Sequence, residues 1–591
     1  MEEEIYALFP RRKHHRFEGV TLGAVALPAR SSKWLIRSAL VLGAGMYLAG
    51  LSATPMQPGN EAMYAYPAIE MLRTGDYLVP QYEHGAFLEK PPLSWWVLAA
   101  SYRLFGESLR AERIPGALAA LLTAALIGLW VRRRSGDTAG AIAALVLLFS
   151  FKFAAFARTS PADTLLTLFV TSSVLLLDRC ARTDGAHDFG SGLAAGLSLA
   201  LAFGVKGPIG VILPVGAVLT GLAIDRKRPV RPLARGMPAL VAFVLLLTPW
   251  HWAMTERFGA AFWQSFYWKH QVLRASSRAF CARIRPPTYY IGVLAAATFP
   301  WFSFLPGSWK SRKSAAAYGW LFFGFLFLSC LALKREVYLM PILPALAAIV
   351  GEHLGSDAAP RASTRWIWRG AALVAGCLFL LSLRAGPALT RLAGATPALV
   401  FEAAFAVVAA AFLVAGSSPG NAVSAGVASL GLAVVFGSFL ILESRLGRLD
   451  PMPRWGELVK GRCRADCAGV RVAVTYTSLD FYSRFEWHDS KTIQDVPRAM
   501  PRAGWVIADS ADETALGRLG RVRVVDRQPV VDENWGRILL RPDTVSPRSL
   551  SLMTFEGGAG ERALLLDASR PHASFRTRRP GLMGAPGGAS R

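Results

Sequence analysis

The stretch TPMQPGNEAMYAYPAIEMLRTGDYLVPQYEHGAFLEKPPLSWW, which runs from Thr54 to Trp96, decides how the fold is interpreted. It follows the first long apolar run and concentrates charged and polar side chains, namely Glu61, Glu70, Asp76, Glu83, His84, Glu89 and Lys90. Binding and catalytic residues tend to collect in loops that a rigid scaffold holds in place. We therefore interpret this stretch as the first extramembrane loop of a multi-span protein and as one half of its active site.

The composition around this loop is that of a membrane protein. The 591 residues are 53% hydrophobic and only 18% charged, and their mean hydropathy is +0.34. These values suit an integral membrane protein better than a soluble one. The 65 basic and 40 acidic residues give a net charge of +25. Because the basic residues lie in short segments between apolar runs, we attribute their excess to membrane topology and not to nucleic-acid binding.

Thirteen apolar segments have about the length needed to cross a bilayer, which takes roughly 20 residues in a helix. They lie near residues 34–52, 113–131, 138–156, 163–179, 190–205, 207–224, 236–254, 288–306, 315–333, 337–353, 366–384, 396–415 and 421–443. Residues 1–33 are polar and basic, which predicts a cytoplasmic N-terminus. With that orientation, five of the six predicted cytoplasmic loops carry a basic cluster, the first being Arg132-Arg133-Arg134.

The composition changes after about Glu443. The segments VRVAVTYTSLDFYSRF, GWVIADS and GRVRVVD, which begin at residues 470, 504 and 520, indicate short strands. The predicted organisation is an α-helical polytopic membrane domain over 34–445 with its first outer loop at 53–112, a small periplasmic α/β domain over 446–545, and a tail over 546–591 whose composition predicts disorder. Cys463 and Cys467 in the α/β domain form either a disulfide or a pair of free thiols.

Two short motifs in the outer loop contain candidate site residues. Glu89 and Lys90 precede two prolines, which restrict the backbone and so hold both side chains in place. Their alternative role is an interfacial anchor with a surface ion pair. Asn60 and Glu61 precede a predicted amphipathic helix that ends at Gly75. Asn60 is therefore either a site residue or an N-cap, and its spacing alone favours the cap.

Later loops add further polar groups. Asp163 begins a predicted span, where it either caps the helix or acts as a functional group, as ionisable residues near membranes often do. His270 is either structural or, with Glu89, a ligand for a divalent ion such as zinc or magnesium, which requires the two side chains to approach each other. Outer-loop cations can hold a phosphate group or contact lipid headgroups, and they are Lys206, Arg274, Arg278, Lys334 and Arg335.

Six motifs follow one another in a fixed order within residues 34–355. They are Asn60-Glu61 with Tyr64-Ala65, Phe87-Leu88-Glu89-Lys90-Pro91-Pro92, Asp163, Lys206-Gly207-Pro208, Trp268-Lys269-His270 with Arg274, and Lys334 to Tyr338 with Pro341. Together they resemble the motifs of bacterial GT-C glycosyltransferases related to protein O-mannosyltransferases. Within that group, they are most similar to the transferases that attach aminoarabinose to lipid A.

The resemblance implies a monomeric glycosyltransferase of the bacterial inner membrane with a periplasmic active site. Such enzymes move a sugar from a polyprenyl (undecaprenyl) phosphate to a lipid A, glycan or protein acceptor, without a nucleotide. A carboxylate acts as general base, and cations or a divalent metal stabilise the leaving phosphate. The matching positions imply a base among Asp163, Glu61 and Asn60, a metal pair of Glu89 and His270, and lipid-phosphate contacts from Lys90, Lys206, Arg274, Lys334, Tyr338 and Tyr64.

Two positions depart from the family pattern. The family has Asp where Asn60 stands and Arg where Met63 stands, and an amide cannot accept a proton as a carboxylate does. Either Asp163 or Glu61 takes over the role of base, or the acceptor differs, or the chain is an inactive binding subunit. We expect Asp163 to be the main base, supported by Glu61. A transporter or flippase of a lipid-linked glycan is the other alternative, although such proteins favour mid-membrane polar groups and internal repeats.

Overall fold

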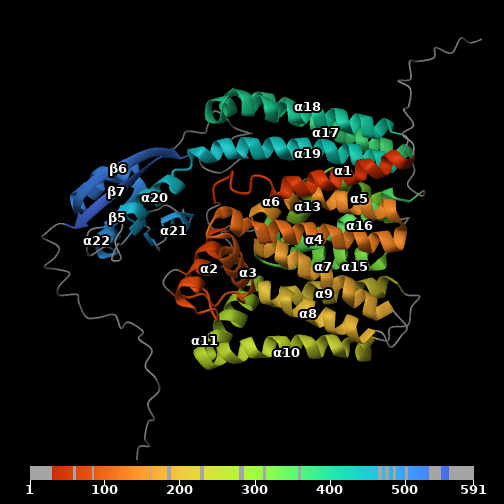
Figure 1. The fold of residues 1–591 in the computed structure, drawn as a ribbon, viewed down its shortest axis with the longest axis horizontal. Helices are drawn as coiled ribbons and strands as arrows, with labels where there is room; N and C mark the ends of the chain where they lie inside the picture. Colours follow the sequence, from red (N-terminus) through yellow and green to blue (C-terminus); the bar gives the residue numbers. More distant parts are fainter. Residues whose placement is uncertain are drawn as a thin grey trace, which may run out of the picture. The chain divides into compact units, whose positions relative to one another are not determined.

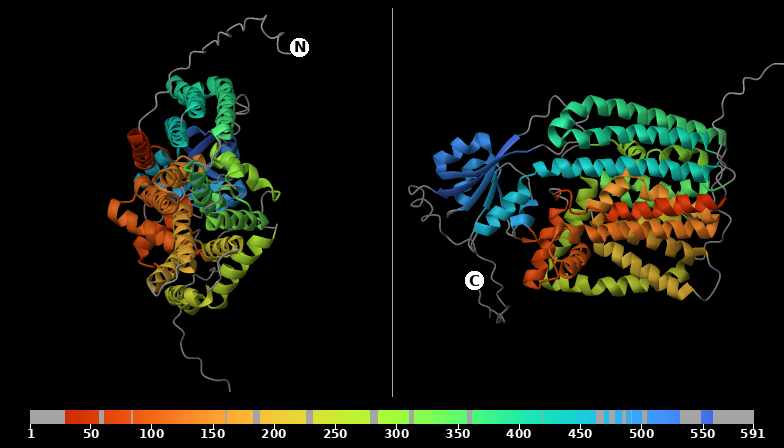
Figure 2. Two further views of the ribbon diagram at one scale, coloured as in Figure 1. Left: turned by 90° about the vertical axis from the view of Figure 1, so that its right-hand side faces the viewer. Right: turned by 45° about the horizontal axis from the view of Figure 1, so that its top comes forward.

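The computed structural model describes residues 29–56, 61–82, 85–159, 161–182, 188–225, 232–277, 285–309, 314–356, 361–418, 420–462, 469–472, 478–483, 487–490, 492–499, 504–530 and 548–557. These residues divide into two units. The first extends to Arg448 and is helical, and the second begins at Leu449 and contains a sheet. Figures 1 and 2 show the long helices of the first unit running side by side.

Eight helices among the described residues are long and apolar enough to cross a membrane. They are α4 (Leu109–Ser135), α7 (Pro161–Arg182), α8 (Asp188–Lys206), α10 (Pro232–Phe258), η5 (Glu336–Ile342) with α16 (Leu343–Leu354), α17 (Arg361–Ala393), α18 (Ala395–Ser417) and α19 (Asn421–Leu446). Two bent pairs raise the number to ten if each is one span, and they are α5 (Asp137–Leu148) with α6 (Phe151–Thr159) and α13 (Tyr289–Ala297) with η3 (Trp301–Phe304) and α14 (Leu305–Ser308). The predicted class, an α-helical multi-span membrane protein, is confirmed.

The number of thirteen spans stays a prediction. Three more helices occupy the remaining predicted segments, and they are α1 (Ala29–Leu48), α9 (Ile209–Ile224) and α15 (Ala315–Cys330). Helices α9 and α15 contain 16 residues each, which is fewer than the roughly 20 that a perpendicular span needs. Apolar composition alone therefore located the helices correctly, but it did not determine whether each one crosses the bilayer.

Short elements gather at one end of the helical unit, where Figure 1 shows α2, α3 and α11. The elements are α2 (Ala62–Thr74), the hairpin of β1 (Gln81–Tyr82) and β2 (Gly85–Ala86), α3 (Leu93–Phe105), α11 (Ala260–Trp263), η1 (Gln264–Leu273) and α12 (Arg274–Ser276). Helix α2 ends where Gly75 adopts a φ of 72° and donates its N–H to the carbonyl of Met71, as a left-handed C-cap requires. Helix α4 begins where the Ser108 side chain accepts from the N–H of Ala111.

The second unit contains a mixed five-stranded sheet with the strand order β4-β3-β5-β7-β6. Its strands are β3 (Gly469–Val472), β4 (His488–Ser490), β5 (Gly504–Asp509), β6 (Gly520–Val530) and β7 (Arg548–Gly557), and its helical segments are η6 (Gly447–Leu449, at the junction), α20 (Met452–Arg462), α21 (Ser478–Ser483), η7 (Ile493–Asp495), α22 (Val496–Ala499), η8 (Ser510–Asp512) and α23 (Glu513–Leu519). Strand β3 is parallel to both neighbours, and β7 is antiparallel to both of its own. The α/β class predicted for this region agrees with these elements.

Alternating side chains of β5 build two cores on opposite faces of this sheet. Trp505 and Ile507 belong to one buried cluster with Trp455 of α20, while Val506 and Ala508 belong to the other. This period of two is what a central strand covered on both faces produces.

One predicted boundary is wrong. Residues from Ser546 onward were expected to be a disordered tail, but Arg548–Gly557 form β7, which lies between β5 and β6. Leu550, Leu552 and Met553 of this strand are fully or almost fully buried. The apolar residues of SLSLMTF were the signal, and the Gly- and Arg-rich composition of the surrounding tail obscured it. Cys463 and Cys467 lie outside the described residues, so the disulfide stays a prediction.

Candidate active site

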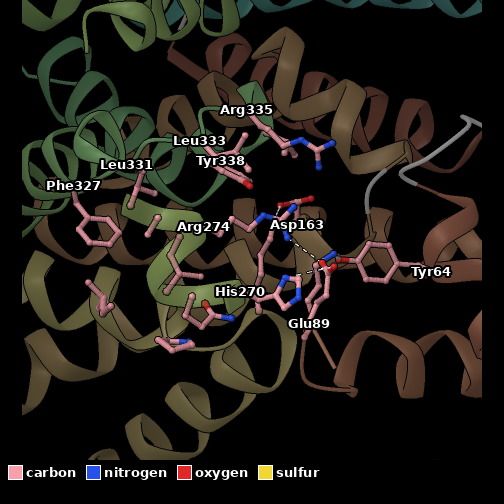
Figure 3. Close-up of a pocket in the computed structure, with 18 residues that line it drawn as sticks. Tyr64, Glu89, Asp163, His270, Arg274, Phe327, Leu331, Leu333, Arg335 and Tyr338 are labelled. Atoms are coloured by element: carbon pink, nitrogen blue, oxygen red, sulfur yellow. Dashed lines mark hydrogen bonds and ion pairs between the residues drawn. The ribbon is translucent and has the colours of Figure 1, made fainter. Parts of the chain in front are cut away.

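A cavity of about 190 Å³ opens in the helical unit. Its wall includes residues of α2, α7, α8, η1 and η5, and of the segment that leads into α3. One part of its wall is polar and contains Tyr64, Glu89, Lys90, Asp163, Lys206, His270, Gln271, Arg274, Arg335 and Tyr338. The other part is mostly apolar and contains Pro208, Ile209, Ile212, Ala275, Phe327, Leu331, Leu333 and Val337. Figure 3 shows Glu89, Asp163, His270 and Arg274 close together, with Phe327 and Leu331 farther along the wall.

Asp163 and Lys206 form a buried ion pair in this wall. Asp163 is in the first turn of α7 and only 3% exposed, and the Nζ of Lys206 donates to its Oδ1. Lys206 is the last residue of α8, and Gly207 follows with a φ of 72°. Because this left-handed conformation favours glycine, the Lys-Gly-Pro sequence turns the chain from α8 into α9 and leaves the lysine beside Asp163. The Nζ of Lys206 also lies 5.2 Å from the ring centroid of Tyr338.

Glu89 and His270 lie next to each other, as predicted. The Nδ1 of His270 is 3.5 Å from the Oε1 of Glu89, and the Nη1 of Arg274 donates to the Oε2 of Glu89 at 3.0 Å. Burial lowers the pKa of His270, and Arg274 and Lys269 lower it further, against the opposite effect of Glu89. His270 is part of η1, a π-helix, and such helices occur frequently at functional sites.

Lys90 is packed against two aromatic rings in the polar part of the wall. Its Nζ donates to the hydroxyl of Tyr64 at 3.1 Å and lies 4.8 Å and 5.7 Å from the ring centroids of Tyr64 and Phe87. Burial lowers the pKa of Lys90 to about 7, and the charge of Lys206 adds to this effect while Glu89 opposes it. Burial also raises the pKa of Tyr64 well above its ordinary value, so its hydroxyl stays protonated at neutral pH.

The pair of Glu89 and His270 offers two ligand atoms of the type that zinc binds. The Nδ1 of His270 is buried and has no hydrogen-bond partner within the part of the chain that the structure describes. Over the same residues, no group of three or more His, Cys, Asp or Glu side chains is arranged to hold an ion. The two side chains therefore fit a metal only if substrate or water supplies its other ligands.

Glu61 does not line the cavity. It is completely buried, and its two oxygens accept from the Nε and Nη2 of Arg113 at 2.6 and 2.7 Å. The Nη1 and Nη2 of Arg113 also donate to the carbonyls of Leu51, Thr54 and Pro55. This placement contradicts the expectation that Glu61 supports the base, because the carboxylate instead fixes the beginning of the outer loop to α4.

Lys334 was predicted to contact the lipid phosphate, but it is not part of the cavity wall. Its Nζ donates to the carbonyl of Leu331 at 2.6 Å, and the neighbouring residue Arg335 lines the cavity. The cavity wall contains every second residue of the segment before η5, namely Leu331, Leu333 and Arg335. A period of two along this segment therefore predicts that Arg335, and not Lys334, faces the cavity. Asn60 and Arg278 lie outside the described residues.

Residues 89–252 match the family described as Dolichyl-phosphate-mannose-protein mannosyltransferase. The chain is 31% identical over 351 residues, 57% of its length, to an undecaprenyl phosphate-alpha-4-amino-4-deoxy-L-arabinose arabinosyl transferase of Pseudomonas fluorescens. It is 30% identical over 342 residues, 55% of its length, to the enzyme of the same description from Pectobacterium carotovorum. The matches cover 58% and 60% of those relatives, so the chain spans about three fifths of their length.

The fold has a close counterpart among solved structures. The crystal structure of ArnT from Cupriavidus metallidurans bound to undecaprenyl phosphate superposes with a TM-score of 0.72 at 20% identity, covering 89% of this chain and 98% of that one. The apo structure of the same protein gives the same TM-score. The resemblance that the six motifs predicted is confirmed by these similarities. The matched segment 89–252 includes Glu89, Lys90, Asp163 and Lys206 of the cavity wall.

Proposed function

We propose that this chain is a glycosyltransferase that moves a sugar from a polyprenyl phosphate to an acceptor bound at the cavity. The observation that carries the proposal is the composition of the cavity wall, in which two ion-paired carboxylates and two further cations face an apolar surface. A lipid phosphate has the same two-part chemistry. The activity of the similar enzymes from Pseudomonas fluorescens and Pectobacterium carotovorum, as their names state it, supports a donor of this class.

The cations account for stabilisation of the leaving group. A polyprenyl phosphate that carries a sugar is a phosphodiester with one negative charge, and the released monoester gains a second. Arg274 donates to Glu89, and Arg274 and Lys90 both line the cavity, where positioned cations lower the energy of developing charge. Ile212, Phe327 and Leu331 offer an apolar surface for the first units of the lipid chain.

Asp163 is our choice for the base. In the proposed step, an acceptor oxygen attacks the anomeric carbon, the bond from that carbon to the phosphate oxygen breaks, and Asp163 takes the proton of the acceptor. Lys206 donates to Oδ1 of Asp163 and so holds the carboxylate in the cavity wall, where an acceptor can reach it. If the acceptor is an ionised phosphate, no proton is transferred, and Asp163 then orients the acceptor through Lys206.

We also propose a divalent ion, zinc or magnesium, between Glu89 and His270. When bound, such an ion would act as a Lewis acid toward the donor phosphate. Arg274 would keep its position on the second oxygen of Glu89, where it holds the carboxylate in place. Removal of the ion by a chelator should then lower donor affinity in wild type, and the same treatment should have little effect on His270→Ala.

The proposed location is the inner membrane, with the cavity at its periplasmic face. Asp163 lies at one end of α7 and Asp178 lies near the other, where it pairs with Arg134 of the arginine triplet. Fifteen helical residues separate them by about 22 Å, so the cavity and the triplet are near opposite membrane surfaces. Reporter fusions after Arg134 should report the cytoplasm, and a fusion after Asp450 should report the outside.

The direct test is transfer by the purified full chain in detergent. A polyprenyl phosphate that carries a radiolabelled sugar is incubated with lipid A, with a glycan or with a protein acceptor, and release of polyprenyl phosphate is measured together with labelled product. We expect transfer with wild type, a loss of at least roughly tenfold in Arg274→Ala, and near-normal transfer in Arg257→Ala, whose arginine pairs with Asp76 outside the cavity. Donor binding without product for every acceptor would favour an inactive binding subunit.

A further inference from the structure

A second and larger cavity lies in the helical unit, away from the site described above. It is a groove of about 750 Å³ whose wall comes from α1, α4 and α5, which contact one another and are labelled in Figure 1. The wall is mostly apolar and built largely from small residues such as Ala125, Gly128, Ala141 and Ala144. Ala125 and Leu129 are exposed, so the groove is open to the surroundings of these helices.

Helices α4 and α5 cannot approach each other further to close the groove. A Cβ atom on Gly140 of α5 would lie only 2.4 Å from the carbonyl oxygen of Gly128 of α4, so the backbones of α4 and α5 are already in contact. An empty groove of this size would leave its wall without van der Waals partners, which favours an apolar occupant from the membrane.

The length of the groove matches one leaflet of a bilayer. Its wall extends from Arg132 to Leu121 on α4 and from Asp137 to Leu148 on α5, which is 11 residues on each helix and therefore about 16 Å. Half of the hydrocarbon core of a bilayer is roughly 15 Å thick. An acyl chain that enters at the Arg132 end would therefore fill the groove down to the bilayer midplane.

The polar end of the groove carries a net positive charge. Arg37 of α1 and Arg132 of α4 line it, together with Asp137 and Thr138 of α5, and Arg132 pairs with Asp137 at 2.6 Å. Two basic side chains and one acidic side chain therefore line this end of the groove. Basic pockets between membrane helices are typical sites for anionic lipid headgroups.

We propose that this groove binds an anionic phospholipid, with one acyl chain along α4 and α5 and the phosphate beside Arg37 and Arg132. Such a lipid would support α1, which packs there against α5 and leads into the loop that Arg113 holds. Lipid binding in this groove does not depend on the proposed transferase activity. A lipid bound here would act as a structural partner of the first helix and would not be a substrate.

Native mass spectrometry of the full chain tests the proposal. The protein is purified in detergent, stripped of lipid, and mixed with equal amounts of phosphatidylglycerol and phosphatidylcholine. We expect one phosphatidylglycerol per chain to be retained at least roughly fivefold more than phosphatidylcholine, since one basic residue near an anionic lipid has about this effect. Arg37→Glu should abolish this preference, whereas Arg133→Glu, which changes an exposed arginine outside the wall, should retain most of it.

A second pair of variants tests the acyl-chain part of the groove. Ala125→Phe fills it and should lower retention of either lipid several-fold, while Leu122→Phe places the same aromatic ring at a position that is 55% exposed and outside the wall. Equal retention of the two lipids by wild type, or equal behaviour of Ala125→Phe and Leu122→Phe, would overturn the proposal. A wild type that is dimeric together with a monomeric Ala125→Phe would identify a second copy as the occupant and would also overturn the proposal. If Ala125→Phe fails to fold, the Arg37 and Arg133 variants decide alone.

Discussion

Two buried ion pairs in the helical unit have similar chemistry and different surroundings. Glu61 and Arg113 are 0% and 1% exposed, and the guanidinium also donates to three backbone carbonyls and to the Thr54 hydroxyl. The side chains of Asp163 and Lys206 are 4% and 16% exposed, and both line the cavity. The first pair joins two segments of the chain, whereas the second can be reached by a ligand.

The difference shows that a buried carboxylate is not a site residue by virtue of burial alone. Arg113 has five N–H groups, and the protein supplies acceptors on both sides of its planar fork. Lysine presents a single ammonium group that can rotate toward a ligand. The ammonium group of Lys206 donates to Asp163 and lies over the ring of Tyr338. We therefore expect the Glu61 pair to determine stability and the Asp163 pair to determine activity.

The largest expected effect is on activity and comes from Asp163→Asn. Loss of a general base typically lowers the rate by about 10² to 10⁴, and the amide can still accept a hydrogen bond from Lys206, so the melting temperature should change little. The measurement is sugar transfer from a polyprenyl phosphate donor, together with a thermal melt. Glu61→Gln is the matched control, since it makes the same change in the other pair. Full activity in Asp163→Asn would show that the base lies elsewhere.

Removal of Arg113 should have the largest effect on stability. Arg113→Met leaves the buried carboxylate of Glu61 without its cation, a change that typically costs about 3–5 kcal/mol. The free energy of unfolding can be followed by denaturant titration in detergent. Arg73→Met is the control, because Arg73 pairs with Glu70 on the surface of α2 at 3.7 Å and such pairs contribute about 0–1 kcal/mol. Similar losses in both variants would mean that the Arg113 network is not what fixes the outer loop.

The contrast between these pairs shows that the sequence alone did not predict which carboxylate belongs to the cavity. Glu61 and Asn60 are adjacent in sequence and both belong to a family motif, so the sequence offered no reason to separate them. Arg113, the partner of Glu61, is 52 residues away and was hidden among the first residues of a predicted span. The motifs did predict that Glu89 approaches His270 and that Lys206 belongs to the site. Those predictions rested on motif order, whereas pairing within a helical bundle depends on which faces of the helices meet.

Lys90 sharpens the comparison, because its charge depends on pH whereas that of Arg113 does not. With a pKa of about 7, Lys90 is charged below pH 7 and loses its proton as the pH rises, so affinity for polyprenyl phosphate should fall between pH 6 and pH 9. The expected fall is roughly tenfold, the contribution of one charged hydrogen bond. The ligand itself gains charge above about pH 6, which acts in the opposite direction.

Lys90→Arg separates these two effects, because arginine stays charged throughout. Its affinity should therefore remain constant or increase with pH, following the titration of the phosphate alone. Binding of polyprenyl phosphate to wild type and variant, measured at several pH values in detergent, gives the two profiles. If both profiles fall together, the pH dependence does not come from Lys90.

The smallest effect is expected at Asn60, the residue next to Glu61 in the same motif. If Asp163 is the base, Asn60 takes no proton, since an amide is not a proton acceptor at neutral pH. Asn60→Ala should then cost less than roughly tenfold in transfer rate, well below the loss expected when a general base is removed. Asn60→Asp adds a carboxylate at the position where the related enzymes have Asp, and it should maintain or raise activity.

The comparison of Asn60→Ala with Asp163→Asn decides which of these two positions acts on the reacting groups. A loss of 10² or more in Asn60→Ala would place the amide in contact with the reacting groups, and the base would then have to be assigned again. A small loss in Asn60→Ala with a large loss in Asp163→Asn would show that this chain carries out transfer without the first carboxylate of its relatives. The outer loop would then contribute Glu89, Lys90 and Tyr64 to the site, while the proton acceptor comes from α7.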